Sequence, residues 1–136
     1  MDSSSWYSKL KKPKWSPPGW LFGPVWSVLY IIIIVSFGTV FYNITSGKLP
    51  AILALPFALN LIFNFLFTPL QFALKSNVLA AIDIVLVLIT LIWALAGICP
   101  VMPWIAYVNI PYLLWVLFAA ALQISITLLN INKEVT

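Results

Sequence analysis

Long runs of apolar residues, separated by short polar turns, are the dominant pattern along this chain. The runs cover about 20–43, 50–74, 78–98 and 103–129. Each is long enough to approach or exceed the roughly 20 residues with which a helix crosses the hydrocarbon core of a bilayer. They are continuously apolar and lack the short alternating segments of a transmembrane β-barrel. The pattern predicts an all-α membrane protein, an up-and-down bundle of four transmembrane helices.

The turns between the runs are short, at about 43–48, 75–77 and 99–103, and they carry Gly, Pro, Ser and Asn. Short connections require antiparallel neighbours. We therefore expect a basic, Trp- and Pro-rich arm over 1–19, the bundle over 20–129 and a short tail over 130–136. Pro69 and Pro111 lie inside the second and fourth runs, where a proline kinks a helix and frees a carbonyl oxygen.

The composition excludes a soluble domain. Hydrophobic residues make up 63% of the chain and charged residues 7%, whereas soluble domains carry roughly 25% charged residues. Histidine is absent and Cys99 is the single cysteine. Because of this, a histidine proton shuttle, a Ser–His or Cys–His nucleophile, an internal disulfide and a cysteine–histidine metal site are all excluded. We expect no bound metal and no required cofactor.

The lysines are distributed unevenly over the turns and ends of the chain. With four crossings, all but Lys48 fall on one side of the membrane: Lys9, Lys11, Lys12, Lys14, Lys75 and Lys133. Cytoplasmic segments carry the excess of Lys and Arg. Both termini are therefore predicted to be cytoplasmic, and we interpret the net charge of +4 as a topology signal rather than as a nucleic-acid-binding surface.

The stretch 15–26 reads WSPPGWLFGPVW and stands at the entrance to the first run. Pro17 and Pro18 fix φ at two successive positions and remove two backbone donors, so this stretch cannot simply continue a helix inward. We interpret Trp15, Pro17 and Pro18 as a rigid lid over the mouth of a small-molecule site.

Few polar side chains lie inside the apolar runs. Asp83 is the only acidic residue there, and a charge at membrane depth is costly unless it is paired or hydrated. Asn60 and Asn64 are four residues apart and share a helix face. Interhelical hydrogen bonding explains such residues, and for Asn64 and Gln123 it competes evenly with a functional role. For Asp83 with Asn60 we favour a ligand cavity, because polar groups that converge with aromatics are typical of one.

Several aromatic residues lie deeper than the interfacial belt. Trp26 and Tyr30 are four residues apart in the first run, and Trp115 lies well inside the fourth. A flat, mostly apolar ligand would stack on such rings and hydrogen-bond to an indole or phenol edge.

At these positions the chain resembles the tryptophan-rich sensory protein family, also called the translocator protein or peripheral-type benzodiazepine receptor family. The matching blocks are WYxxLxKPxWxPPxWxFGPVWxxLY over 6–30, LNL over 59–61, DI at 83–84 and PYLxWxxFAxxL over 111–122. The resemblance implies a helical membrane protein, commonly a homodimer, that binds porphyrins and other tetrapyrroles, sterol-like lipids and synthetic ligands under the Pro-Pro loop.

The resemblance also implies site residues. Trp26 and Trp115 match tryptophans with which some bacterial members degrade protoporphyrin in light, Phe22 and Gly23 match positions that line the pocket, and Ala119 and Leu122 match its wall. Together with the residue-based candidates, the predicted ligand-binding set is Phe22, Gly23, Trp26, Tyr30, Asn60, Phe63, Asp83, Trp115, Ala119 and Leu122.

The chain departs from the family pattern in four ways. The family has five helices with the Trp-Pro block after the first, and this chain starts at that block; an absent helix would open one pocket wall unless a second copy or lipid fills it. Phe63 stands where the family usually has Trp and Pro56 where it often has Gln. Gln123 replaces the usual Asn, and the C-terminal cholesterol motif is absent.

The function expected from the sequence is an integral membrane ligand-binding protein, a sensor or carrier for porphyrin or other tetrapyrrole, or for sterol-like lipid molecules. An enzyme that photo-oxidises porphyrin through Trp26 and Trp115 is an alternative, but the chain offers no paired carboxylates or histidine for other chemistry. A small transporter or structural subunit is another. The expected partners are the lipid bilayer of a bacterial or archaeal cell, the small-molecule ligand and a second copy of the chain.

Overall fold

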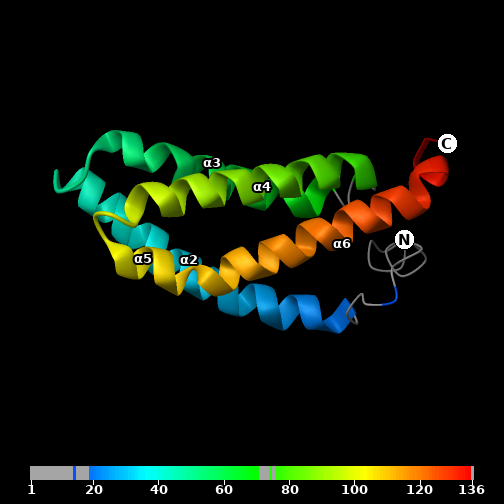
Figure 1. Cartoon of the computed structure of the whole chain (residues 1–136), viewed down its shortest axis with the longest axis horizontal. Helices are drawn as coiled ribbons and strands as arrows, with labels where there is room; N and C mark the ends of the chain where they lie inside the picture. The colour runs from blue at the N-terminus through cyan, green and yellow to red at the C-terminus, as the bar shows by residue number, and fades with distance from the viewer. Residues whose placement is uncertain (1–13, 15–18, 71–73, 75, 136) are drawn as a thin grey trace.

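The computed structural model describes residues 14, 19–70, 74 and 76–135 (Figure 1). Over these residues the chain is helical and contains no strand. The α-helices are α2 (Phe22–Thr45), α3 (Ala54–Thr68), α4 (Asn77–Ile98), α5 (Pro103–Val108) and α6 (Ile110–Val135), and 3₁₀ turns at Gly19–Leu21 and Ala51–Leu53 precede α2 and α3. The all-helical membrane bundle predicted from the sequence is confirmed.

Local sequence signals account for the helix ends. After α2 the chain reverses through Gly47, whose φ of +82° suits glycine. At the start of α4 the Ser76 hydroxyl accepts a hydrogen bond from the Leu79 N–H at 3.2 Å, as an N-cap. Pro103 occupies the beginning of α5, where its missing N–H costs nothing. The observed helices therefore start within a few residues of the predicted runs.

The helices differ in length from the prediction in two places. Within the part of the chain that the structure describes, three helices are long and apolar enough to cross a membrane: α2, α4 and residues 110–130 of α6. Helix α3 has 15 residues and rises about 22 Å, less than the roughly 30 Å hydrocarbon core. Helix α6 continues to Val135. Residues 130–135, which were predicted to belong to a short tail after the bundle, are therefore the last residues of this helix.

The fourth predicted run is divided into α5 and α6 at Asn109. The break lies just before Pro111, whose ring lacks the N–H that would bond to the carbonyl oxygen of Tyr107. The Asn109 side-chain amide donates to the Ile105 carbonyl oxygen at 2.8 Å and to the Ser36 hydroxyl of α2 at 3.0 Å. The break is therefore tied to α2 by a buried polar contact.

Helix α4 is the centre of the bundle and packs closely against α3 and α6 (Figure 1). Helix α2 is less enclosed: 28% of the residues in its most apolar stretch are buried, against 44% in α4 and in α6. The core includes the large, fully buried side chains of Phe37, Phe57, Ile84, Leu91 and Tyr112. The loose seating of α2 leaves room between it and α3.

A cluster of buried hydrogen bonds joins α3, α4 and α6. The Tyr112 hydroxyl donates to Asn60 Oδ1 at 2.9 Å and accepts from Asn64 Nδ2 at 2.7 Å. Asn60 Nδ2 in turn donates to the Val87 carbonyl oxygen at 3.0 Å and to Thr90 Oγ1 at 3.3 Å. Interhelical hydrogen bonds of this kind hold helices together where lipid replaces water.

We expect Tyr112→Phe to lower the free energy of unfolding in mild detergent by about 1 kcal/mol, because it leaves Asn60 and Asn64 without their shared hydroxyl. Denaturant titration followed by circular dichroism measures the change. Tyr107→Phe is the matched control, since Tyr107 is 65% exposed and its loss should have no effect. Equal stability of the two variants would contradict the structural role of the cluster.

Candidate functional site

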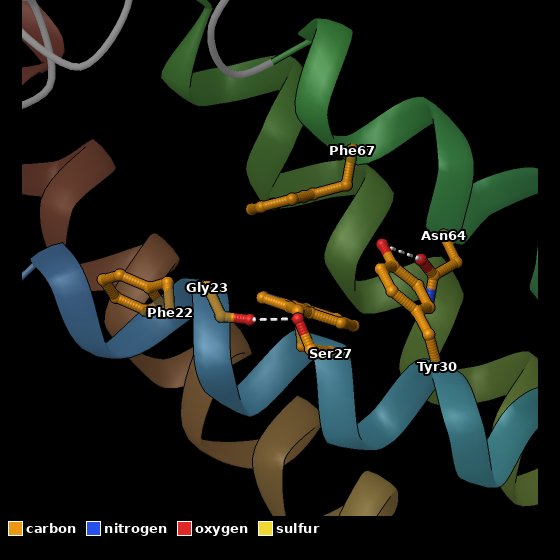
Figure 2. A pocket seen from close by; sticks show the side chains of 7 residues that line it. Phe22, Gly23, Ser27, Tyr30, Asn64 and Phe67 are labelled. Carbon is orange, nitrogen blue, oxygen red and sulfur yellow. Dashed lines mark hydrogen bonds between the residues drawn. The ribbon is translucent and has the colours of Figure 1, made fainter.

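A cavity of about 330 Å³ lies between the first half of α2 and the end of α3 (Figure 2). Four of its seven lining side chains carry aromatic rings, so we call this space the aromatic cavity. Its lining residues are Phe22, Gly23, Trp26, Ser27, Tyr30, Asn64 and Phe67.

Helical spacing brings the aromatic side chains of α2 to one face. Phe22, Trp26 and Tyr30 recur every four residues and therefore stack along α2. The rings of Trp26 and Tyr30 are 5.6 Å apart and inclined by 31°. Phe67 extends from α3 toward α2 from the opposite side (Figure 2). The cavity thus has aromatic walls from both helices.

The polar groups of the cavity are few and uncharged. The Tyr30 hydroxyl donates to Asn64 Oδ1 across the space between α2 and α3 (Figure 2), at 3.4 Å. This is long for a hydrogen bond. The Ser27 hydroxyl donates to the Gly23 carbonyl oxygen within α2 at 2.9 Å. Because Asn64 also donates to Tyr112, the cavity is in direct contact with the buried cluster.

Trp115 of α6 supports the wall from behind. Its ring meets Trp26 edge to face with centroids 6.5 Å apart and Phe22 at 5.7 Å. It also contacts Phe118 of the same helix, with ring centroids 5.4 Å apart. The Trp115 indole N–H is buried without a hydrogen-bond partner among the described residues. Trp115 therefore positions Trp26 and does not itself line the cavity.

A second cavity, the lateral groove, continues along the same two helices and has a volume of about 480 Å³. It shares Tyr30 and Asn64 with the aromatic cavity. Its other walls are hydrocarbon or aromatic, apart from one glycine: Ile33, Ile34, Phe37, Gly38, Phe41, Leu61 and Phe65.

The structure brings only part of the predicted ligand-binding set together. Phe22, Gly23, Trp26 and Tyr30 line the aromatic cavity. The other predicted residues lie elsewhere in the bundle and line neither of these two cavities: Asn60, Phe63, Asp83, Trp115, Ala119 and Leu122. The lid residues Trp15, Pro17 and Pro18 lie outside the described part of the chain.

The residues outside the cavities are part of the packed interior. Asn60 is fully buried in the hydrogen-bonded cluster, and Phe63 packs against the core. Asp83 is 3% exposed on α4, and its Oδ2 has no partner among the described residues. Ala119 and Leu122 are buried on α6. The predicted pairing of Asp83 with Asn60 at a ligand cavity is not seen at either of the two cavities between α2 and α3.

Sequence reasoning did not include three lining residues in the site. From the sequence, Asn64 was open to both a structural and a functional interpretation. In the structure it is hydrogen-bonded in the buried cluster and also lines the aromatic cavity. Phe67 lies one turn after Asn64, a spacing that places the two on the same face. Ser27 follows Trp26 directly, and no pattern in the sequence distinguishes it from other exposed serines.

The model of the TspO/MBR family matches residues 1–129. The chain belongs to this family. It is 38% identical over 129 residues to the tryptophan-rich protein TspO of Bacillus cereus, with 93% of this chain and 81% of the relative covered. Protein CrtK of Rhodobacter capsulatus is 39% identical over 133 residues, with 96% and 81% covered.

The similarity extends to animals. The human translocator protein is 30% identical over 121 residues, with 87% of this chain and 70% of the relative covered. The resemblance noted from the sequence is thereby confirmed at the level of the family. Membrane-length helices and bacterial and archaeal relatives together identify an integral membrane protein.

The arrangement is suited to binding a flat, mostly apolar molecule. Among the described residues, no group of three or more His, Cys, Asp or Glu side chains could hold a metal ion. The cavity volume falls within the roughly 300–1,000 Å³ typical of ligand pockets, with apolar walls and a few polar groups. A flat ring that inserts between α2 and α3 would meet Trp26 and Phe67.

We expect the aromatic cavity to be open to small reagents. In a Cys99→Ser background, Ser27→Cys should react with a neutral maleimide in detergent much faster than Ala94→Cys. Ser27 is exposed in the cavity, whereas Ala94 is fully buried on α4. Mass spectrometry over time gives the rates, and equal rates would mean that the cavity is closed in solution.

Proposed function

We propose that this TspO/MBR family protein is a membrane ligand-binding protein, a sensor or carrier that takes a porphyrin-like or sterol-like molecule into the aromatic cavity. The observation that carries this proposal is the pair of facing aromatic walls from α2 and α3, with Asn64 and Tyr30 between them. Flat ligands gain binding free energy by stacking on such walls, and a few polar groups fix their orientation.

The position of the cavity supports an amphipathic ligand. Phe22 and Gly23 belong to the first turn of α2, at one end of a membrane-spanning helix, whereas Asn64 is buried. Carboxylates on the rim of a ring could remain near the lipid headgroups while the ring itself entered the cavity. Relatives are named a tryptophan-rich sensory protein in Cereibacter sphaeroides and a translocator protein in humans, which agrees with a ligand-handling role.

A light-dependent porphyrin-oxidising activity is the second candidate. Trp26 and Trp115 are in edge-to-face contact, and Trp26 also lines the cavity. An excited ligand would therefore lie against a tryptophan that has another tryptophan behind it. Illumination of the porphyrin complex tests this activity: a spectral change lost in Trp26→Phe would support it, and an unchanged spectrum would leave passive binding.

The topology and assembly predicted from the sequence belong to this proposal. Both termini are placed in the cytoplasm and the functional unit is a homodimer. Lys14 and Lys48 stand before and after α2 and are both exposed. The predicted cytoplasmic side carries six lysines, Lys14 among them, and the other side carries Lys48 alone, which by the positive-inside rule supports this orientation.

Protoporphyrin titration tests the site. We expect saturable changes in porphyrin absorbance with the wild type, and about tenfold weaker binding for Trp26→Ala, because stacking on one aromatic side chain contributes roughly 1–3 kcal/mol. Asp83→Asn is the matched control: it conserves shape, lies outside both cavities and should change the affinity less than about twofold, a fraction of what one good contact contributes.

Two results would contradict the proposal. The first is the absence of saturable binding in folded wild-type protein. The second is an equal loss of affinity in Asp83→Asn and Trp26→Ala, which would place the ligand nearer to α4 and return the site to the residues first favoured from the sequence.

A further inference from the structure

The aromatic cavity and the lateral groove meet end to end along the interface between α2 and α3. The aromatic cavity is lined by α2 up to Tyr30, and the lateral groove takes over at Tyr30 and follows α2 as far as Phe41. Tyr30 and Asn64 belong to both. The two spaces therefore differ in chemistry but share one polar boundary.

The lateral groove opens toward the surroundings of a membrane-spanning helix. Ile34 and Phe65, which line it, are 71% and 64% exposed. In a bilayer that exposure is to hydrocarbon, which satisfies no polar groups and wets apolar surface. An apolar groove at this depth is filled by a hydrocarbon chain and not by water.

The shared boundary can offer hydrogen-bond donors to a ligand. Asn64 Nδ2 carries two hydrogens and donates one to Tyr112, so the other is available. The Tyr30 hydroxyl now donates to Asn64 at 3.4 Å, a bond long enough to be given up cheaply. A carbonyl oxygen placed between them could accept from both.

We propose that the aromatic cavity and the lateral groove form a single site for a lipid quinone, a membrane-dissolved molecule with a flat dicarbonyl ring and a long hydrocarbon tail. The ring lies between Trp26 and Phe67, one carbonyl oxygen accepts from Tyr30 and Asn64, and the tail occupies the groove past Phe37. This ligand class goes beyond the porphyrin-like or sterol-like molecule proposed above, because it explains the groove as well as the cavity.

The lining chemistry favours a quinone over a phospholipid and over a ring without a tail. No charged side chain lines either cavity among the described residues, so a phosphate headgroup would lose its hydration without gaining a counter-charge. A tail-less ring leaves the groove unused. In a quinone, the uncharged ring matches the aromatic cavity, a carbonyl oxygen matches the donors of Tyr30 and Asn64, and the apolar tail matches the lateral groove.

Two glycines allow each part of the site to be filled separately. Gly23 lines the aromatic cavity and Gly38 lines the groove, and a Cβ built on either meets no atom within 4 Å. A side chain can therefore start at each position without a clash at its Cβ, and the branched end of a leucine would occupy the adjoining space. Ala96→Leu, at an exposed position of α4, adds similar bulk away from both cavities and is the matched control.

The test compares a decyl-tailed benzoquinone with the same benzoquinone ring without its tail. Saturable tryptophan quenching is measured in detergent micelles, and quenching of tryptophan octyl ester in the same micelles corrects for simple partitioning. Wild-type protein should bind the tailed ring at least about tenfold more tightly than the tail-less ring, an effect that burial of two methylene groups already produces.

The variants should separate the two parts. Gly38→Leu should weaken the tailed quinone to the level of the tail-less ring, and leave the tail-less ring and protoporphyrin unchanged. Gly23→Leu should weaken both quinones and protoporphyrin, and Ala96→Leu should change none of them. Tyr30→Phe should weaken both quinones several-fold through the lost donor.

The outcomes also separate this inference from the proposed function. If the wild type does not bind protoporphyrin but binds the tailed quinone, and Gly38→Leu weakens that quinone binding, the proposed function is overturned and the quinone site is supported. Equal binding of both quinones, or no effect of Gly38→Leu, overturns the quinone site. A wild-type dimer that Gly38→Leu converts to a monomer also overturns it, because the groove is then an interface between copies of the chain.

Discussion

The hydroxyl of Tyr112, held between Asn60 and Asn64, is the contact on which the arrangement of the helices depends. It lies in a region where lipid contributes no hydrophobic force between helices, so association relies on packing and on hydrogen bonds. Through Asn60 it fixes α3 against α4, and through its own position it fixes α6 against α3. With all three partners buried, no water competes for these bonds.

The uneven strength of the helix contacts explains where the cavities form. Helices α3, α4 and α6 share the polar cluster and pack closely, whereas α2 is attached to them by isolated polar contacts. One is the Asn109–Ser36 bond beside the break before α6, and another is the long Tyr30–Asn64 bond. Both cavities lie along the less tightly packed side of the bundle, between α2 and α3. Ligand binding at Tyr30 would act on the weakest of these contacts and reach the cluster through Asn64.

Asn64 combines two positions that the sequence left as alternatives. It belongs to the buried hydrogen-bonded cluster and it lines the aromatic cavity. Its amide has enough donors and acceptors to serve both Tyr112 and the cavity. Asp83 shows the opposite case. An acidic residue at membrane depth is an expected functional candidate, but the structure buries it on α4, where it lines neither of the two cavities, and the aromatic cavity is lined instead by uncharged side chains.

The sequence by itself determined where the apolar helices begin, their order, the membrane environment and the family, but not the length of α3 or the division of the fourth run into α5 and α6. Apolar run length, capping residues such as Ser76 and prolines act locally, so their effects can be derived from neighbouring residues alone. The aromatic face of α2 also followed from four-residue spacing. Which residues meet it from α3, and that Trp115 lies behind Trp26 instead of opposite it, depended on helix rotation and tilt. Those are set by side-chain packing between distant segments, and only the tertiary structure decided them.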